Sequence, residues 1–308
     1  MPSFELNRDN YSTPEADIAY MSCSQYQSWL ECEAATLAKL QGRYTEEPTE
    51  ALIVGNYVHT YFEGEQAHRE FLAQNADAIF KTKTVKGETV ITGKYAAYEK
   101  ADAMIHALEN YPAAKAFIDK PGENEVIFTG ELFGMPWRIR VDKYIPLMNT
   151  IVDYKTVADL HKTEYDPEYG AKVPFLITYG YFMRAAVYTE IYKQSQGTDI
   201  DPHFLLLCVT KQDPPDKEVF RLNDRDVYDI ELEKVKKHIP RIKRIKEGSI
   251  KPLRCETCAY CRATKNRGVV PYSFIMPGFS EREEDDYLAN FHLDKAENNE
   301  QRTSVQEA

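Results

Sequence analysis

Residues 138–156, RIRVDKYIPLMNTIVDYKT, carry the clearest structural signal in the chain. Two runs rich in β-branched and aromatic residues flank the turn residues 146–149, and this pattern predicts a β-hairpin. Asp142 lies on the first strand, and Asp153 and Lys155 on the second. Side chains two apart on a strand share a face, and two carboxylates held close together repel unless a cation separates them. Mg²⁺, a hard ion that binds carboxylates and water, suits that position.

The pattern D…DxK on a hairpin resembles the active site of the PD-(D/E)xK nuclease superfamily. The spacing between Asp142 and Asp153 suits its RecE-type branch, which has an exodeoxyribonuclease VIII-like domain. A surface hairpin with an ordinary ion pair is the alternative, because Asp-x-Lys alone is a common tripeptide.

A second segment, TEALIVGNYVHTYFEG at residues 49–64, places Gly55, His59 and Glu63 on one face of a helix. Glycine allows another backbone or a ligand to approach closely, and a neutral imidazole can bind a metal. The segment resembles the GxxxHxxxE helix of RecB- and RecE-like nucleases, whose histidine contacts the active-site metal. A histidine in the core or on the helix surface is the alternative.

The chain has 308 residues, of which 43% are apolar and 28% are charged, as expected of a soluble globular protein. It has no apolar run long enough for a bilayer and no signal pattern at its start, so we expect a cytoplasmic protein without a membrane partner. The net charge of −11 opposes general binding of nucleic acid. We expect a polar N-terminal arm at 1–20, loosely attached, a nuclease domain at 21–278 and an acidic, disordered tail at 279–308.

The periodicity predicts a mixed α/β domain. The expected elements are a helix at 22–42 containing Cys32, a helical insert at 65–118 with a Lys-rich loop at 81–92, strands at 125–134, 135–146 and 150–156, a mobile loop at 157–170, a helix at 173–194, an apolar strand at 203–212 and a helix at 224–248 kinked at Pro240. The resemblance implies a restriction-endonuclease-like core, in which helices flank a central mixed sheet.

Two helices supply candidate DNA contacts. From Lys234 onward, the helix at 224–248 carries seven basic residues, Lys234, Lys236, Lys237, Arg241, Lys243, Arg244 and Lys246. They are candidate phosphate ligands, and a solvated face is the alternative. On the helix at 173–194, the family often has QxxxY. Here Arg184 and Tyr188 occupy those two positions, and Arg184 could bind a phosphate or belong to the core.

Cysteines supply a candidate second metal site. The motif CETCAYC contains Cys255, Cys258 and Cys261, a metal-ligand spacing in a reducing compartment. Cys32 is the candidate fourth ligand, because related AddB-type nucleases hold a [4Fe–4S] cluster with one early and three late cysteines. The spacing here is tighter than theirs. Zinc, or thiols without a metal, are the alternatives.

The resemblance implies a metal-dependent DNA exonuclease. Asp142 and Asp153 would bind Mg²⁺ or Mn²⁺ with the Tyr154 carbonyl, His59 would complete a second metal position, and Lys155 would act on the attacking water. Glu125 or Glu131 could add a ligand. The resemblance also implies 5′→3′ digestion of linear double-stranded DNA, a ring-shaped homo-oligomer, a single-strand-annealing partner and a role in phage or prophage recombination. A single-strand or endonucleolytic RecB/AddB-like nuclease and a non-catalytic nucleic-acid-binding module are the alternatives.

Overall fold

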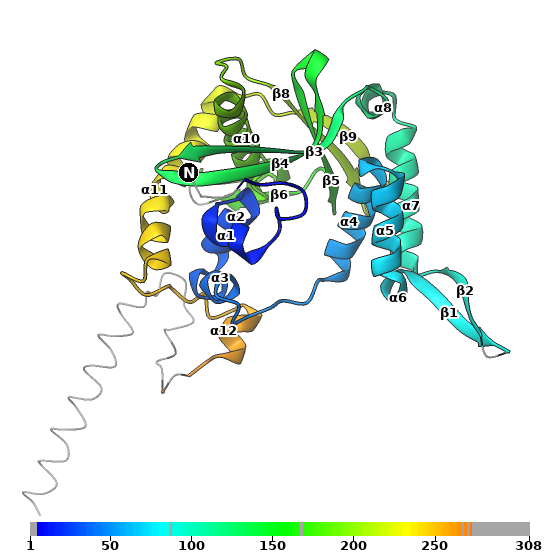
Figure 1. Ribbon diagram of the computed structural model, residues 1–308, viewed down its shortest axis with the longest axis horizontal. Helices are drawn as coiled ribbons and strands as arrows, with labels where there is room; N and C mark the ends of the chain where they lie inside the picture. The colour runs from blue at the N-terminus through cyan, green and yellow to red at the C-terminus, as the bar shows by residue number, and fades with distance from the viewer. Residues whose placement is uncertain (1–4, 87, 167–168, 267, 270–271, 273–308) are drawn as a thin grey trace, which may run out of the picture.

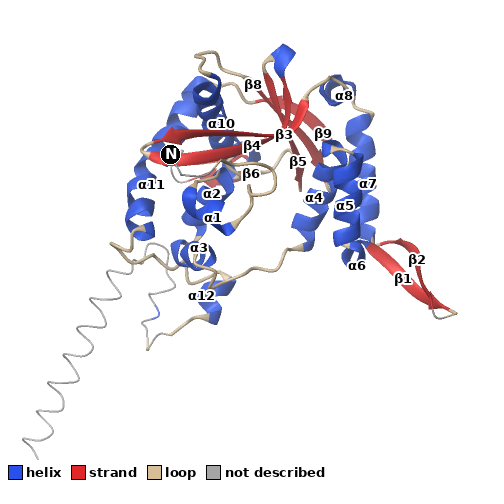
Figure 2. Cartoon of the chain, viewed as in Figure 1, coloured by secondary structure: helices blue, strands red, loops and turns tan. Residues whose placement is uncertain are grey.

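The computed structural model describes residues 5–86, 88–166, 169–266, 268–269 and 272. A mixed sheet forms its centre (Figures 1 and 2). Its five strands are, in spatial order, β3 (Glu123–Leu132), β4 (Met135–Ile145), β5 (Thr150–Val157), β8 (His203–Thr210) and β9 (Lys217–Arg221). β5 and β8 are parallel, whereas the other neighbouring pairs are antiparallel. This confirms the predicted central mixed sheet and places the β4–β5 hairpin inside it.

Helices cover both faces of the sheet (Figure 1). One face packs against α2 (Cys23–Glu31), α10 (Tyr181–Gln196) and α11 (Arg225–Lys246), and the other against α4 (Glu50–Glu63), α7 (Ala96–Glu109) and α8 (Pro112–Ile118). Consecutive residues of β8 alternate between the two cores: Phe204 and Leu206 face the first, and Leu205 and Leu207 face the second. A strand buried on both sides explains why this segment is almost continuously apolar.

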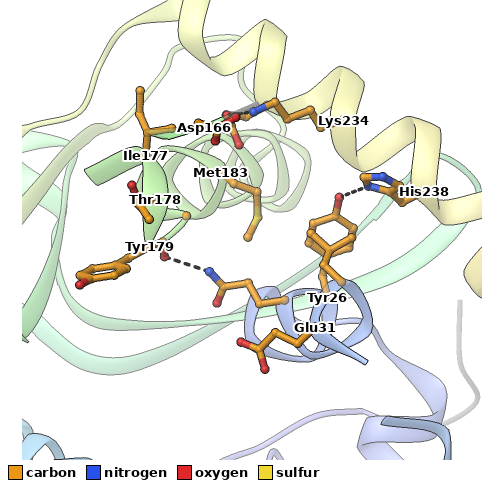
Figure 3. A pocket seen from close by; sticks show the side chains of 13 residues that line it. Tyr26, Glu31, Asp166, Ile177, Thr178, Tyr179, Met183, Lys234 and His238 are labelled. Atoms are coloured by element: carbon orange, nitrogen blue, oxygen red, sulfur yellow. Dashed lines mark hydrogen bonds and ion pairs between the residues drawn. The ribbon is translucent and has the colours of Figure 1, made fainter. Parts of the chain in front are cut away.

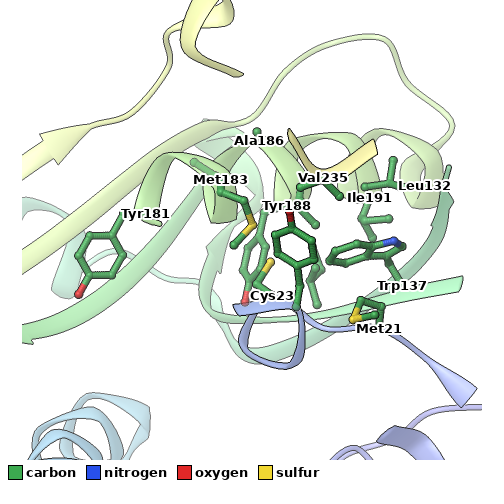
Figure 4. Packing of buried hydrophobic residues seen from close by; sticks show 14 of the residues in the cluster. Met21, Cys23, Leu132, Trp137, Tyr181, Met183, Ala186, Tyr188, Ile191 and Val235 are labelled. Atoms are coloured by element: carbon green, nitrogen blue, oxygen red, sulfur yellow. The ribbon is translucent and has the colours of Figure 1, made fainter. Parts of the chain in front are cut away.

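The first core is dominated by aromatic and branched side chains. Figure 4 shows Trp137 of β4 beside Ile191 of α10 and Met21, which precedes α2. Met21 also pairs with β4, because its N–H donates to Pro136 O at 2.8 Å and its carbonyl accepts the N–H of Arg138. The start of the chain thus satisfies backbone groups of β4 that β5 does not reach.

The remaining elements are smaller. They are α1 (Pro14–Ala19), α3 (Glu33–Leu40), α5 (Glu65–Gln74), α6 (Ala76–Ile79), β1 (Phe80–Val85), β2 (Glu88–Lys94), the 3₁₀ helix η1 (Pro146–Met148), β6 (Thr163–Asp166), β7 (Ala171–Pro174), α9 (Phe175–Thr178) and α12 (Ala259–Ala263). The predicted helical insert corresponds to α5 to α8. Along the described chain, no helix has the length and apolar character needed to cross a membrane.

The prediction of one continuous helix at 22–42 is wrong, because the helix is interrupted at Cys32. Cys32 has extended backbone angles, φ −163° and ψ 104°, so the segment divides into α2 and α3. The Cys32 Sγ accepts the N–H of Ala35 and caps the start of α3. Helical apolar spacing continues through this break, and periodicity alone therefore could not locate it.

Parts of three segments expected to be irregular form regular structure. The predicted Lys-rich loop at 81–92 contributes to the two-stranded ribbon of β1 and β2, which projects from the body (Figure 2), and the predicted loop at 157–170 contains β6. The arm expected to be loosely attached contains α1, and its Tyr11 ring lies 4.8 Å from the Arg140 guanidinium.

The predicted helix at 173–194 is wrong in its first part. That part forms the end of β7 and the short helix α9, and the long helix α10 begins only after Gly180, whose backbone is left-handed. α11 is helical through Pro240. The expected tail at 279–308 lies outside the described residues.

Candidate active site and cysteine cluster

Three acidic residues lie in line across three neighbouring strands. The β3–β4 ladder pairs Asn124 with Lys143 and Val126 with Val141, so Glu125 lies opposite Asp142. The β4–β5 ladder ends at Lys143 and Val152, and the next pair would be Asp142 and Asp153. The sheet register therefore brings together carboxylates that are far apart in the sequence.

Asp142 is fixed where β4 and β5 separate. Its Oδ2 accepts the backbone N–H of Tyr154 at 2.8 Å, and its Oδ1 lies 3.0 Å from His59 Nε2. Burial alone would raise the pKa of Asp142, but the charges of His59 and Lys155 and these hydrogen bonds hold it well below its usual range. Asp142 is thus an ionised acceptor in a largely enclosed place.

Helix α4 carries His59 to this carboxylate. The helix packs on β5 where a Cβ at Gly55 would lie 3.5 Å from Thr156 Oγ1, and where the Phe62 and Tyr154 rings stack with centroids 4.7 Å apart. Burial lowers the pKa of His59, but the nearby carboxylates, Asp142 first, outweigh this effect and raise it above its ordinary value. The predicted face of Gly55 and His59 is therefore the face that meets the sheet.

Glu125, rather than Glu131, belongs to the site. Its Oε1 lies 3.5 Å from His59 Nε2, and its Oε2 lies 2.6 Å from Arg140 Nε. Glu125 is buried and has a left-handed φ of 55°, whereas Glu131 is exposed near the far end of β3. Burial raises the pKa of Glu125 against the opposing effect of Arg140. Arg140 is a site residue that the sequence did not indicate.

Lys155 bridges the two carboxylates of the hairpin. Its Nζ pairs with Asp153 Oδ2 and lies 3.9 Å from Asp142 Oδ2. The same Nζ donates to the Tyr154 carbonyl at 3.0 Å, the oxygen that the sequence offered as a metal ligand. Asp153 is 1% exposed, and Lys155 places a positive charge beside this buried carboxylate.

Arg184 also contacts this acid from α10. Its Nη1 lies 3.7 Å from Asp153 Oδ1 and 3.4 Å from the Tyr188 hydroxyl. The Tyr188 hydroxyl donates to the Arg140 carbonyl at 3.1 Å, and the Tyr188 ring is buried. Both residues therefore lie beside the acidic site, with Tyr188 in the core.

The donor set fits a hard divalent cation. One oxygen or nitrogen each of His59, Glu125 and Asp142 lies within 4.8 Å of the others. In the part of the chain that the structure describes, the buried oxygens Glu125 Oε1 and Asp153 Oδ1 have no hydrogen-bond donor. Buried acceptors normally have a partner, and carboxylates with an imidazole suit Mg²⁺ or Mn²⁺.

A cavity of about 310 Å³ opens beside this site. Its lining includes His59, Glu125 and Arg140, together with Arg8 from the N-terminal arm. A second cavity, of about 620 Å³, lies between α2, α9 and α11 (Figure 3), where the Tyr26 hydroxyl meets His238 Nδ1 at 2.8 Å. None of the candidate catalytic residues lines that second cavity, so the smaller one is the functional candidate.

The basic helix α11 is partly engaged within the fold. Lys234 pairs with Glu231, Lys236 with Glu233, and Lys246 donates to the Ile18 carbonyl. Arg241 makes two hydrogen bonds to Glu33, at 2.6 and 2.8 Å. For Lys237, Lys243 and Arg244 the described residues provide no ion-pair partner.

The four predicted cysteine ligands come together. Cys32 Sγ lies 3.5 Å from Cys261 Sγ, which lies 4.0 Å from Cys255 Sγ, and Cys258 completes the group. Burial would raise the pKa of Cys255, but hydrogen bonds from Thr257 and from the Cys258 N–H lower it to about 6. A thiolate at this position is therefore favoured, as a metal ligand requires.

Comparisons with known proteins agree with this geometry. The family model described as "PDDEXK-like domain of unknown function (DUF3799)" matches residues 22–264. A crystal structure named "Putative exonuclease", from Eubacterium rectale, is similar with a TM-score of 0.79 and 31% sequence identity, over 90% of this chain and 100% of that one. No curated protein matches the chain. The PD-(D/E)xK fold is thus confirmed, the RecE-type branch stays a prediction, and the chain belongs to the family of PDDEXK-like domains.

Proposed function

We propose that this protein is a nuclease that uses Mg²⁺ or Mn²⁺ to hydrolyse phosphodiester bonds of DNA. The observation that carries the proposal is the row of Glu125, Asp142 and Asp153 across three strands, with Lys155 between the last two. Here a lysine lies beside buried carboxylates, and a histidine from helix α4 contacts one of them. Clusters of charged groups with shifted pKa values are typical of functional sites, and this one suits phosphate chemistry.

Each side chain has a role that follows from its position. Asp142, Glu125, His59 and Asp153 would hold the metal, which when bound would neutralise charge developing on the phosphate and lower the pKa of water. Lys155 would orient the attacking water and donate to the charged phosphate oxygens. Arg140 keeps the Glu125 carboxylate in place through its 2.6 Å contact. Arg184 contacts the other oxygen of Asp153, Oδ1, at 3.7 Å and would help to hold this carboxylate in place.

We further propose an exonuclease that acts on linear duplex DNA. The similar protein from Eubacterium rectale is named an exonuclease, and the cavity of about 310 Å³ is lined by His59 and Glu125 of the candidate metal site. Arg8 and Arg140 line that cavity together with Glu63 and Glu125, and their guanidinium groups are the candidate phosphate ligands there. The 5′→3′ direction, a ring-shaped homo-oligomer, a single-strand-annealing partner and a role in phage recombination rest on the resemblance alone.

One assay tests both the nuclease proposal and the narrower exonuclease proposal. Linear duplex DNA labelled at the 5′ end or the 3′ end, nicked circles, closed circles and single strands are incubated with Mg²⁺, with Mn²⁺ or with EDTA. Metal-dependent loss of nucleotides from linear duplex, with closed circles intact, is expected. Cleavage of closed circles, or a strong preference for single strands, would replace the exonuclease proposal with the RecB/AddB-like alternative. No cleavage of any substrate with either metal would overturn the nuclease proposal.

A further inference from the structure

The four cysteine sulfurs are closer together than an iron–sulfur cluster allows. All four lie within 4.8 Å of one another, and two of the contacts measure 3.5 and 4.0 Å. Four thiolates around one tetrahedral zinc ion, with Zn–S of about 2.3 Å, lie about 3.8 Å apart. In a [4Fe–4S] cluster each cysteine binds a different iron, and the inorganic core spreads the sulfurs to roughly 6 Å.

We propose that Cys32, Cys255, Cys258 and Cys261 form a structural zinc site that fastens the end of the nuclease domain to its first helices. The site is independent of the acidic centre, because zinc with four thiolates has no open position for chemistry. This differs from the [4Fe–4S] cluster that the sequence resemblance favours.

Backbone geometry supports ligation by these sulfurs. Each of three N–H groups donates to a cysteine sulfur: Ala35 to Cys32, Cys258 to Cys255, and Cys261 to Cys258. Such N–H···S bonds favour the charged thiolate that a metal requires. The break between α2 and α3 also supports ligation by Cys32. The backbone of Cys32 is extended there, and its sulfur lies 3.5 Å from Cys261 Sγ.

The surroundings indicate a fastening role. Cys32 and Cys261 are buried with Ala34 and Ala35 in a small core of their own, separate from the two main cores. This core is too small to hold a chain segment by hydrophobic burial, so a metal would supply stability that packing does not. The site closes a loop of more than 200 residues between Cys32 and Cys255, which restricts the unfolded chain strongly.

Neighbouring contacts tie the same elements together. The Glu33 carboxylate accepts the Leu253 N–H at 2.6 Å and binds Arg241, and the Ala34 N–H donates to the Leu253 carbonyl. Polar contacts therefore align the residues beside the cysteines before a metal binds. These contacts hold the two backbone segments at the separation that gives the short sulfur–sulfur distances.

Metal content distinguishes the possibilities directly. The full chain is purified without oxygen from cells grown in ordinary medium and from cells grown with added iron and cysteine. Zinc, iron and acid-labile sulfide are then measured per chain. About one zinc per chain in both preparations, with no visible colour, is expected. Iron and sulfide at cluster stoichiometry in the second preparation, or metal-free protein in both, overturns the proposal.

A variant and a spectroscopic probe complete the test. Cys32→Ala should lose the zinc and lower the melting temperature, whereas Cys208→Ala, a buried cysteine outside the site, should keep it. Zinc retained by Cys32→Ala contradicts the assigned ligand set. If Cys32→Ala does not fold, the visible absorption spectrum of wild-type protein exchanged with Co²⁺ tests the proposed thiolate ligands instead. Intense red-region absorption typical of tetrahedral thiolate ligation supports the site, and weak octahedral bands overturn it.

Discussion

Asp142 Oδ2 accepts the backbone N–H of Tyr154 at 2.8 Å, at the point where the β4–β5 ladder has ended. The carboxylate thus takes the place of a backbone acceptor and is held in one orientation. The same residue meets His59 from α4 through its other oxygen. One side chain therefore joins sheet, helix and candidate metal, so substitutions here would mix structural and chemical effects. Asp153 and Lys155 are the cleaner positions for testing the chemistry.

Asp153→Asn and Lys155→Gln should each lower the cleavage rate by about 10²-fold or more, because each removes a charge that acts on the metal or the developing phosphate charge. DNA affinity should change little, and circular dichroism checks that each variant is folded, because both residues belong to a buried ion pair. Asp229→Asn, at an exposed position of α11, is the control and should cleave normally. Single-turnover cleavage of labelled duplex measures the effect. Near wild-type rates in either site variant would remove the residue from the proposed machinery.

Glu125→Gln should raise the Mg²⁺ concentration needed for half-maximal cleavage by about 10-fold or more, since it removes one charged ligand. The matched control is Glu131→Gln on the same strand, where the side chain is exposed and away from the site. Cleavage titrated with Mg²⁺ compares the two. Equal metal dependence of both variants would mean that Glu125 only pairs with Arg140.

His59→Ala should reduce cleavage less completely than Asp153→Asn, because the carboxylates remain as metal ligands. The reduction should shrink when Mn²⁺ replaces Mg²⁺ at high concentration. His106→Ala, at an exposed position of α7, is the control. Cleavage rates with each metal provide the measurement. Full activity of His59→Ala at limiting Mg²⁺ would assign His59 a structural role beside Asp142.

The ribbon β1–β2 and the helix α11 are the two candidate surfaces for DNA contact. Removing positive charges from each in turn shows which one binds phosphates. On the ribbon β1–β2, Lys81, Lys83 and Lys86 are exposed and, within the described chain, have no ion pair. Replacing all three with Gln should flatten the slope of log K against log salt by about 0.9 for each phosphate that the protein no longer neutralises. The matched comparison replaces three charges of α11, Lys237, Lys243 and Arg244, with Gln. We expect the larger change from the ribbon; a larger change from α11 would restore the helix as the main contact.

The hairpin chemistry could be predicted because its signals are local. β-branched runs around a short turn fix the strand pairing, and strand pairing places Asp142 beside Asp153. The choice between Glu125 and Glu131 could not be made in the same way, because both lie on β3. It depends on the register with β4, which puts Glu125 opposite Asp142, and periodicity does not reveal register.

Other features escaped prediction because tertiary contacts override local pattern. Helical spacing runs through Cys32, yet the backbone is extended there because the sulfur meets Cys261 from the far end of the chain. Residues 80–94 lack an alternating apolar face, so the ribbon could not be distinguished from a polar loop. Arg241 was predicted as a DNA contact from charge alone, and charge says nothing about a carboxylate that folding brings near.

Arg241 provides the last prediction, since its two hydrogen bonds to Glu33 join α11 to the start of α3 beside the cysteines. Arg241→Ala should destabilise the fold by about 2 kcal/mol, as expected for hydrogen bonds between charged groups, and should leave the salt slope of DNA binding unchanged. Glu33→Ala should destabilise at least as much, because Glu33 also accepts the Leu253 N–H.

In the double variant the two destabilising effects should not add, because each single substitution already removes the shared pair. Urea unfolding of the four proteins measures this coupling. Lys237→Ala, one turn earlier on an exposed position of α11, is the control and should change stability by less than about 0.5 kcal/mol. Additive effects, or a flattened salt slope in Arg241→Ala with unchanged stability, would show that Arg241 binds phosphate instead of fastening α11 to α3.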